Sequence, residues 1–580
     1  MNINIININI EEESFRLLCS AVSRSLNIKG CRIDGSGYPL TLKIDGGLRE
    51  DEYLVHSDSC KAIVTSGGVS GVFAGAGKFL RKSSFDGVGG FEPYVGDFSL
   101  RPENPIHGIY FATHFSNFYE SAPIEEVQAV IEDCALRGCN ALMMWYDMFQ
   151  YDSVDTPESL VMIARLKALF NHAISVGMKT VLCSLANEAF RTSDPLLRAE
   201  WTAQNGYIAP PGHHYHVEIC PSKEGGISAI LEARRSVLDA LSDIRIDYVA
   251  AGPYDQGGCT CKNCAPWGGV GYMKMLDALI PFYKETLPSA KLLGSTWYFD
   301  RFYPGEWDVF YKTAKEKQRP EVEYLIGFFS NAETDYGYIP KAPDFIKKSD
   351  FPIGKGILAF SEISMYKCRP WGGYGASPLP SHFEKIFNDT KSLYSGALPY
   401  SEGIFEDINK ALMFAFYSGE YSNSRDVITE YGAYEFALSG DRLNDFVEMI
   451  YLMETSHVHY PFDEDWNKVV ATEYSDVRLI IDNPENVEKV KLLCDNLHAT
   501  LPELIKNSQR WQLIRLRALI DYELFSCDMH ISETCEGYMQ TLCNIYHTEN
   551  GRRMVSPPTR MAMHRELMRI RSLEASEAPL

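Results

Sequence analysis

The sequence from residue 106 to about residue 404 is dominated by short apolar runs that alternate with longer amphipathic stretches. An apolar run of this kind is typical of a buried parallel strand, and the amphipathic stretch after it is typical of a crossover helix. The apolar runs cover residues 106–115, 140–146, 179–186, 248–252, 292–297, 323–329, 356–360 and 397–400. Helical patterns between them include residues 124–137, 159–176, 227–242, 272–285 and 382–392. Eight such units in about 300 residues favour a closed (β/α)8 barrel over an open, doubly wound sheet.

The two ends of the chain differ from this central part. Strand patterns at residues 3–10, 53–56 and 62–65, a helical pattern at 11–26 and a glycine-rich turn at 67–77 predict a small α/β domain over residues 1–103. Beyond residue 405 only helical spacing remains, at residues 407–417, 426–438, 442–454, 487–501, 508–525 and 561–574. The expected fold class is therefore α/β: a (β/α)8 TIM barrel over residues 104–419, preceded by the small α/β domain and followed by an all-helical domain over residues 420–580.

The charge balance limits the partners of the chain. Its 580 residues carry 55 Lys and Arg against 77 Asp and Glu, which gives a net charge of −22. This charge disfavours nucleic acids and anionic membranes, because both bind cationic surfaces. The sequence has no window of about 18 consecutive apolar residues and no secretory pattern at its start. The 15 cysteines are then most simply reduced thiols, so we expect a cytoplasmic protein, for which a homo-oligomer is compatible with the sequence.

Acidic and aromatic residues follow several of the predicted strands. Glu188, Asp255, Glu362 and Glu402 follow the third, fourth, seventh and eighth apolar runs. Active sites of barrels lie at these carboxyl ends, and a pair of carboxyl groups divides the proton transfers of glycoside cleavage. The candidates for binding a sugar among them are Trp145, Tyr146, Asn187, Tyr254, Gln256, Trp297, Tyr298 and Trp371. The pattern predicts the pocket of a glycosidase.

Three cysteines, Cys259, Cys261 and Cys264, lie within six residues. Cys220 is a candidate for a fourth ligand, and nearby histidines at residues 213, 214 and 216 are substitutes for it. Four thiolates form a closed tetrahedral zinc site, so the pattern predicts a structural zinc ion. The alternative is a set of reduced thiols in a tight loop. A catalytic zinc is disfavoured, because the sequence lacks an H-E-x-x-H motif.

Short motifs in the chain resemble the broad group formed by glycoside hydrolase families 20, 67 and 163. His107-Gly108-Ile109-Tyr110-Phe111 resembles the first barrel strand of this group, and residues 139–145 resemble the second. Asp255 with the cysteines after it resembles the strand-4 signature of family 163, and Ser401-Glu402-Gly403 resembles the exit from the barrel. The resemblance implies a small α/β domain, a catalytic barrel and a helical domain, and it favours hexosaminide or uronide-like substrates.

The sequence departs from the hexosaminidase pattern at one position. In family 20 an Asp-Glu pair follows strand 4, where the Asp orients the acetamido group of the substrate and the Glu is the acid. Here Asp255 is followed by Gln256, and an amide cannot act as a general acid. A retaining mechanism with carboxylates from two strands fits better. The predicted pair is Asp255 and Glu362, with Glu188 and Glu402 as alternates for catalysis or as acceptors for sugar hydroxyls.

The predicted function is therefore a β-hexosaminidase-like glycosidase of carbohydrate metabolism, which cleaves an oligosaccharide or glycoconjugate and needs no cofactor for catalysis. Two other classes stay open. One is a carbohydrate-binding barrel that lacks catalysis, because of the change at Gln256. The other is a zinc-dependent hydrolase that uses the cysteines and the nearby histidines.

Overall fold

The computed structural model describes residues 2–114, 117–208, 216–253, 257–297, 299–327, 329, 353–364, 375–456, 458 and 481–547. The largest sheet in these residues has ten strands, and every pairing between neighbours is parallel. Its strands are β8 (Ile106–His107), β9 (Ile109–Phe111), β10 (Ala141–Trp145), β11 (Lys179–Leu185), β12 (Tyr248–Gly252), β13 (Lys291–Ser295), β14 (Val322–Gly327), β15 (Ile357–Ala359), β16 (Tyr394–Ala397) and β17 (Tyr400–Ser401). Their order is β17-β9-β10-β11-β12-β13-β14-β15-β16-β8.

The two ends of this sheet meet. β8 and β9 are separated by Gly108 alone, and β16 pairs with β8 while β17 pairs with β9. The amide of Gly108 donates to the carbonyl of Ala397, and the amide of Tyr110 donates to that of Pro399, both at 2.9 Å. The ten strands thus occupy eight positions around a ring, which is consistent with the predicted (β/α)8 barrel. The first expected strand ends earlier than predicted, at residue 111, and the eighth already begins at residue 394.

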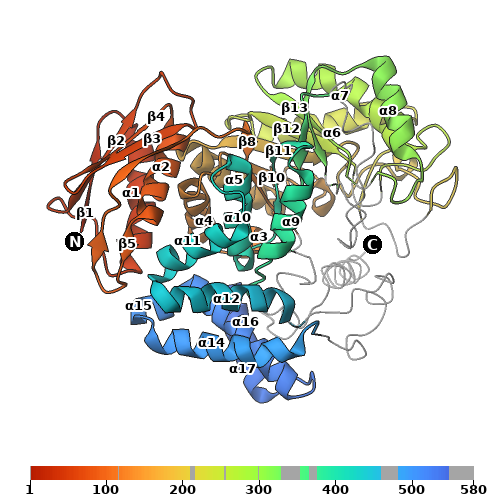
Figure 1. Cartoon of the computed structure of the whole chain (residues 1–580). Helices are drawn as coiled ribbons and strands as arrows, with labels where there is room; N and C mark the ends of the chain where they lie inside the picture. The colour runs from red at the N-terminus through yellow and green to blue at the C-terminus, as the bar shows by residue number, and fades with distance from the viewer. Residues whose placement is uncertain are drawn as a thin grey trace.

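Helices surround this ring, as Figure 1 shows. They are α3 (Phe118–Ser121), α4 (Ile124–Leu136), α5 (Pro157–Ser175), α6 (Gly226–Ala240), α7 (Tyr272–Thr286), α8 (Glu306–Lys317) and α9 (Pro380–Thr390). Alternate strand residues, such as Met143 and Trp145 of β10, form an apolar cluster inside the ring, and the residues between them pack outward toward the helices. Strands covered on both faces are buried along their whole length, which explains the continuous apolar runs in the sequence.

A second sheet lies before the barrel. It contains β1 (Ile3–Asn7), β2 (Tyr38–Ile44), β3 (Tyr53–Ser57), β4 (Ala62–Ser66) and β7 (Gly96–Leu100) in the order β1-β2-β4-β3-β7, and a short hairpin joins β5 (Ser84–Phe85) to β6 (Phe91–Glu92). β1, β2 and β4 are parallel, and β3 runs antiparallel to both of its neighbours. Helices α1 (Glu12–Asn27) and α2 (Val69–Lys82) lie between this sheet and the rest of the molecule, where both contact α4 (Figure 1).

The glycine-rich stretch at residues 67–77 differs from the expected turn. α2 begins at Val69, so Gly75 and Gly77 lie inside the helix. A Cβ at Gly77 would lie 1.9 Å from the carbonyl oxygen of Leu136 at the end of α4, and one at Gly75 would lie 2.7 Å from Cγ1 of Val64 in β4. The glycines therefore serve the close packing of α2 against its neighbours.

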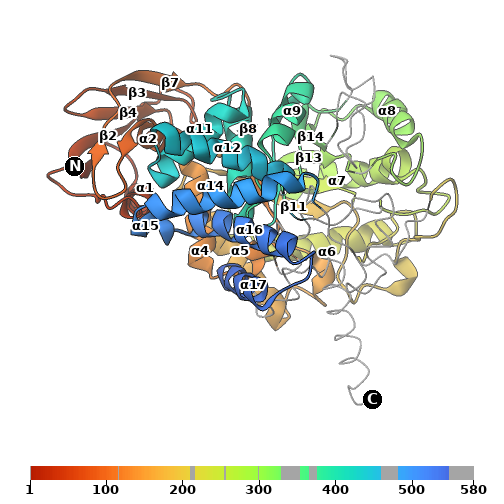
Figure 2. The ribbon, with the colours of Figure 1, turned by 60° about the horizontal axis from the view of Figure 1, so that its bottom comes forward.

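Helices make up the part of the chain described after the barrel. They are α10 (Asp407–Ser418), α11 (Ser424–Phe436), α12 (Gly440–Ser456), α14 (Val487–Thr500), α15 (Glu503–Lys506), α16 (Gln509–Ser526) and α17 (Glu533–Ile545). Figure 2 shows α14 beside α16, with α17 next to α16. The helix expected at residues 561–574 lies outside the described residues. In the parts of the chain that the structure describes, no helix is long and apolar enough to span a membrane.

Candidate functional site

The parallel strands bring three of the four predicted carboxylates to one mouth of the ring. Glu188, Glu362 and Glu402 follow β11, β15 and β17, and the carboxyl ends of parallel strands lie on the same side of a barrel. All three side chains are buried. The fourth, Asp255, lies outside the described residues, as do Tyr254, Gln256, Tyr298 and Trp371.

Glu188, which follows β11, is hydrogen-bonded to a buried tryptophan. It is fully buried, and its Oε2 accepts a hydrogen bond from Nε1 of Trp145 at 3.0 Å. Burial raises the pKa of Glu188 to about 8, although Arg234 and the Trp145 hydrogen bond oppose this shift. The carboxyl group is then protonated at neutral pH, and a protonated carboxyl is what a general acid requires.

A buried polar cluster, which the sequence analysis did not predict, adjoins Glu188. Nε2 of His216 lies 2.9 Å from Oδ1 of Asp147. One possible ligand atom from each of Asp147, Glu188 and His216 lies within 4.8 Å of the other two. Glu218 pairs with Glu188 in an isolated antiparallel bridge, and burial holds the pKa of Glu218 well above its usual range. The group could hold a metal ion, and within it Nε2 of His216 and Oδ1 of Asp147 are in hydrogen-bond contact.

Glu402 follows β17, which pairs with β9 on the side away from β10. Its Oε1 accepts a hydrogen bond from the hydroxyl of Tyr400 at 3.0 Å, and that hydroxyl lies 3.4 Å from Nε2 of His114. The ring of His114 packs against that of Trp145, with centroids 5.0 Å apart. A continuous series of contacts thus joins Glu402 to Glu188 across the mouth.

The backbone at Glu402 is held by a further carboxylate. Oε1 of Glu406 accepts hydrogen bonds from the amides of Glu402 at 2.6 Å and Gly403 at 3.1 Å. Burial raises the pKa of Glu406 to about 7, although Lys410 lowers it. Glu406 therefore positions Glu402 and does not line the mouth itself.

Glu362 is the least enclosed of the three glutamates, with 7% of its surface exposed. It forms an isolated parallel bridge with Tyr400. The neighbouring Phe360 packs against Trp297, at 5.0 Å between ring centroids, and against Tyr400, at 5.9 Å. Glu362 thus keeps a small exposed surface and lies two residues after a phenylalanine that packs against other rings.

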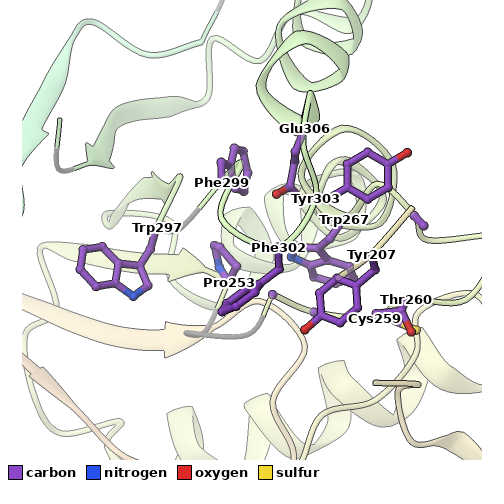
Figure 3. Close-up of a pocket in the computed structure, with 13 residues that line it drawn as sticks. Tyr207, Pro253, Cys259, Thr260, Trp267, Trp297, Phe299, Phe302, Tyr303 and Glu306 are labelled. Carbon is purple, nitrogen blue, oxygen red and sulfur yellow. The ribbon is translucent and has the colours of Figure 1, made fainter. Parts of the chain in front are cut away.

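An aromatic pocket begins beside Trp297, between the loops that follow β12 and β13 (Figure 3). Figure 3 shows the rings of Tyr207, Trp267 and Phe302 gathered at one end of it and Trp297 at the other. Glu306 also lines this pocket, and burial raises the pKa of its carboxyl to about 7. The pocket has a volume of about 20 Å³, which is room for about one water molecule, and Trp267 and Phe299 in its wall are at most 5% exposed.

Two of the expected sugar contacts have other partners. Tyr146 belongs to the core outside the ring, where its hydroxyl lies 2.6 Å from Oγ of Ser159 in α5. Alternation along β10 puts Trp145 inside the ring and turns Tyr146 away from it, so Tyr146 does not face the mouth, contrary to the prediction. Asn187 is fully buried, and its Nδ2 donates to the carbonyls of Ile219 and Gly258, both at 3.0 Å. Asn187 therefore joins two loops instead of facing the mouth.

The four cysteines expected as metal ligands lie together. The Sγ atoms of Cys220, Cys259, Cys261 and Cys264 are all within 4.8 Å of one another. Every cysteine that the structure describes is a free thiol. The sulfurs come from two segments of the chain that are about 40 residues apart, so this juxtaposition is a product of the fold.

The comparisons with known proteins show the fold. No family model and no curated protein matches the sequence. Among solved structures, a family 89 glycoside hydrolase from Clostridium perfringens in complex with PUGNAc is 12% identical, with a TM-score of 0.58 over 92% of this chain and 65% of that chain. A GH20 exo-β-N-acetylglucosaminidase from Vibrio harveyi in complex with N-acetylglucosamine is 11% identical, with a TM-score of 0.50 over 77% of this chain and 74% of that chain.

A third similar structure is a GH138 enzyme targeting pectin rhamnogalacturonan II, which is 11% identical, with a TM-score of 0.53 over 94% of this chain and 72% of that chain. This chain spans just under two thirds of the Clostridium perfringens enzyme. At these identities the likeness establishes a fold shared with glycoside hydrolases, and family 20 of the resemblance is among the similar structures.

Proposed function

We propose that this protein is a glycoside hydrolase that cleaves its substrate at the mouth of the barrel. The observation that carries the proposal is the set of three buried glutamates, Glu188, Glu362 and Glu402, that end parallel strands of one ring beside aromatic side chains. The fold shared with glycoside hydrolases supports the same function.

Cleavage of a glycosidic bond needs a protonated acid at the leaving oxygen and an ionised carboxylate at the anomeric carbon or at a water molecule. We assign the carboxylate role to Glu362, because it is the most exposed of the three glutamates. Asp255 remains the partner favoured by the sequence. Glu188 is the alternate acid, since burial raises its pKa to about 8 and keeps it protonated at neutral pH.

For the substrate we propose an N-acetylhexosaminide. The resemblance to family 20 favours this class, and two similar structures contain N-acetylglucosamine or the substrate GlcNAc-alpha-1,4-galactose. The uronide class is the second choice.

The test is a screen of aryl glycosides, with both anomers of N-acetylglucosamine, N-acetylgalactosamine and glucuronic acid. We expect turnover on one of them and a loss of at least about a hundredfold in kcat for Glu362→Gln and Asp255→Asn, which is the lower end for general acid and base groups. Glu12→Gln, at an exposed position of α1, is the control and should keep wild-type turnover.

The outcome also assigns the roles. If Asp255→Asn keeps its turnover while Glu188→Gln loses it, Glu188 is the acid. Retention of wild-type turnover by the amide variants of Asp255, Glu188, Glu362 and Glu402 would contradict the two-carboxylate mechanism. Binding of an oligosaccharide by calorimetry without turnover of any glycoside would instead identify a carbohydrate-binding barrel.

A further inference from the structure

Four cysteine sulfurs converge beside the loop that follows β12. Cys220 comes from the segment after Glu218, and Cys259, Cys261 and Cys264 come from the loop between β12 and α7. We propose that these four thiolates bind one zinc ion, which fixes the two segments to each other. This inference does not depend on the glycosidase proposal.

The distances between the sulfurs match a tetrahedral metal site. A zinc ion with Zn–S bonds of about 2.3 Å places neighbouring sulfurs about 3.8 Å apart. Sγ of Cys220 lies 3.7 Å from Sγ of Cys261 and 3.7 Å from Sγ of Cys264. A disulfide would need a separation of about 2 Å, so the arrangement does not represent two bonded pairs.

The surroundings of the sulfurs suit a negatively charged centre. Four thiolates around Zn²⁺ leave a net charge of −2, which nearby donors must stabilise. The amide of Glu200 donates to Sγ of Cys259 at 3.5 Å, and Oγ of Ser222 lies 3.1 Å from Sγ of Cys264. Nζ of Lys274 donates to Oγ of Ser222 at 2.6 Å and brings a positive charge to the same side.

The coordination set is closed, which makes the site structural. Cys220, Cys259 and Cys264 are at most 2% exposed, and four protein ligands leave no open position for water or substrate. The four cysteines lie close to the mouth of the barrel. Asn187 donates to the carbonyls of Ile219 and Gly258, which adjoin Cys220 and Cys259. The metal would thereby fix the position of Asn187, the neighbour of Glu188.

The first test is the metal content of the full chain, purified under reducing conditions without chelators or metal-affinity resin. Elemental analysis should find about one zinc ion per chain. Cys264→Ser should retain less than about a tenth of this zinc. The matched control is Cys494→Ser, which changes another buried cysteine, in α14 and outside the cluster, and should keep the full metal content.

A second measurement decides the matter if Cys264→Ser fails to fold. The wild-type protein, exchanged with Co²⁺, should show the intense visible and thiolate-to-metal bands of a tetrahedral tetrathiolate site. The proposal is overturned if the reduced wild-type protein contains no zinc and takes up neither zinc nor cobalt. Iron in place of zinc, a disulfide within the cluster by mass spectrometry, or full metal content in Cys264→Ser would also overturn it.

Discussion

The carboxyl groups of the barrel mouth differ in how far each is withdrawn from water. Glu188 is fully buried beside Trp145, whereas Glu362 keeps some exposed surface. Burial favours the protonated form of a carboxyl group, so neighbouring glutamates on one rim can hold different protonation states at one pH. This is the property that a two-carboxylate hydrolase needs, and its clearest signature is a pH dependence of stability.

Glu188 should make the folded protein less stable at alkaline pH. Its pKa is raised to about 8 in the folded state, against about 4.3 in the unfolded chain, so the folded state binds more protons between these values. Its contribution to stability is complete below about pH 4.3 and is lost progressively as the pH rises from there to about 8. The melting temperature of Glu188→Gln should therefore fall less than that of the wild type between about pH 5 and pH 8.

The control for this prediction is Glu12→Gln, at an exposed position of α1, whose curve should run parallel to that of the wild type. The free energy of unfolding falls by at most about 1.4 kcal/mol per pH unit for one proton, so thermal melts at several pH values can resolve the change. Parallel curves for the wild type and Glu188→Gln would show that Glu188 is ionised in the folded state at neutral pH.

The position of an individual site residue can be predicted from the sequence when that residue directly follows a barrel strand. Glu188 and Glu402 were expected at the mouth because they follow apolar runs, and the strands place them there. His216 and Glu218 approach Glu188 through an antiparallel bridge formed about 30 residues later in the chain. A long-range contact of this kind leaves no periodic pattern in the sequence, although the histidines at residues 213, 214 and 216 are a weak signal for His216.

At the level of elements, burial on both faces explains why the barrel strands were predictable and some other elements were not. The apolar runs of β10 and β12 and the apolar stripes of α4 and α7 are direct results of packing. The close packing of α2 explains why its glycine-rich sequence was expected to form a turn. A helix that touches its neighbours through glycines resembles a turn in sequence, because both uses depend on the absence of a side chain.

Gly77→Ala tests the close approach of α2 to α4. Alanine normally stabilises a helix interior over glycine by about 1 kcal/mol. Here the new Cβ would lie 1.9 Å from the Leu136 carbonyl oxygen, so the helices must separate, and we expect a destabilisation of about 1–3 kcal/mol. Urea denaturation of the two proteins measures the difference.

The matched control is Gly537→Ala in α17, where an added Cβ meets no atom within 4 Å. This second substitution should stabilise the protein by about 0.5–1 kcal/mol, because only the helix propensity changes. We therefore predict that the same substitution lowers the stability of the protein at Gly77 and raises it at Gly537. An equal gain at both positions would mean that α2 does not contact α4 as closely as the structure shows.

At the level of the whole molecule, buried ion pairs join the first part of the chain to the helices after the barrel. Lys78 and Arg81 of α2 pair with Glu420 and Glu430, and all four side chains are at most 13% exposed. The two positive and two negative charges balance. A balanced buried set contributes little net stability by itself, but removal of one member leaves an uncompensated charge.

Glu430→Gln should therefore lower the free energy of unfolding at pH 7 by about 3–5 kcal/mol. Burial alone would raise the pKa of Glu430, but Arg81 and Lys78 outweigh burial and lower it to about 2. Since the folded pKa lies below the unfolded value of about 4.3, its stabilisation is present above pH 4.3 and is lost as the pH falls toward 2. The deficit of the variant should be full at pH 7 and should shrink steadily below about pH 4. Urea denaturation at pH 7 and at about pH 3 measures this, with the exposed Glu13→Gln as a control that should leave the free energy of unfolding nearly unchanged. A deficit that stays constant into acid would mean that Glu430 acts through its packing and not through its charge.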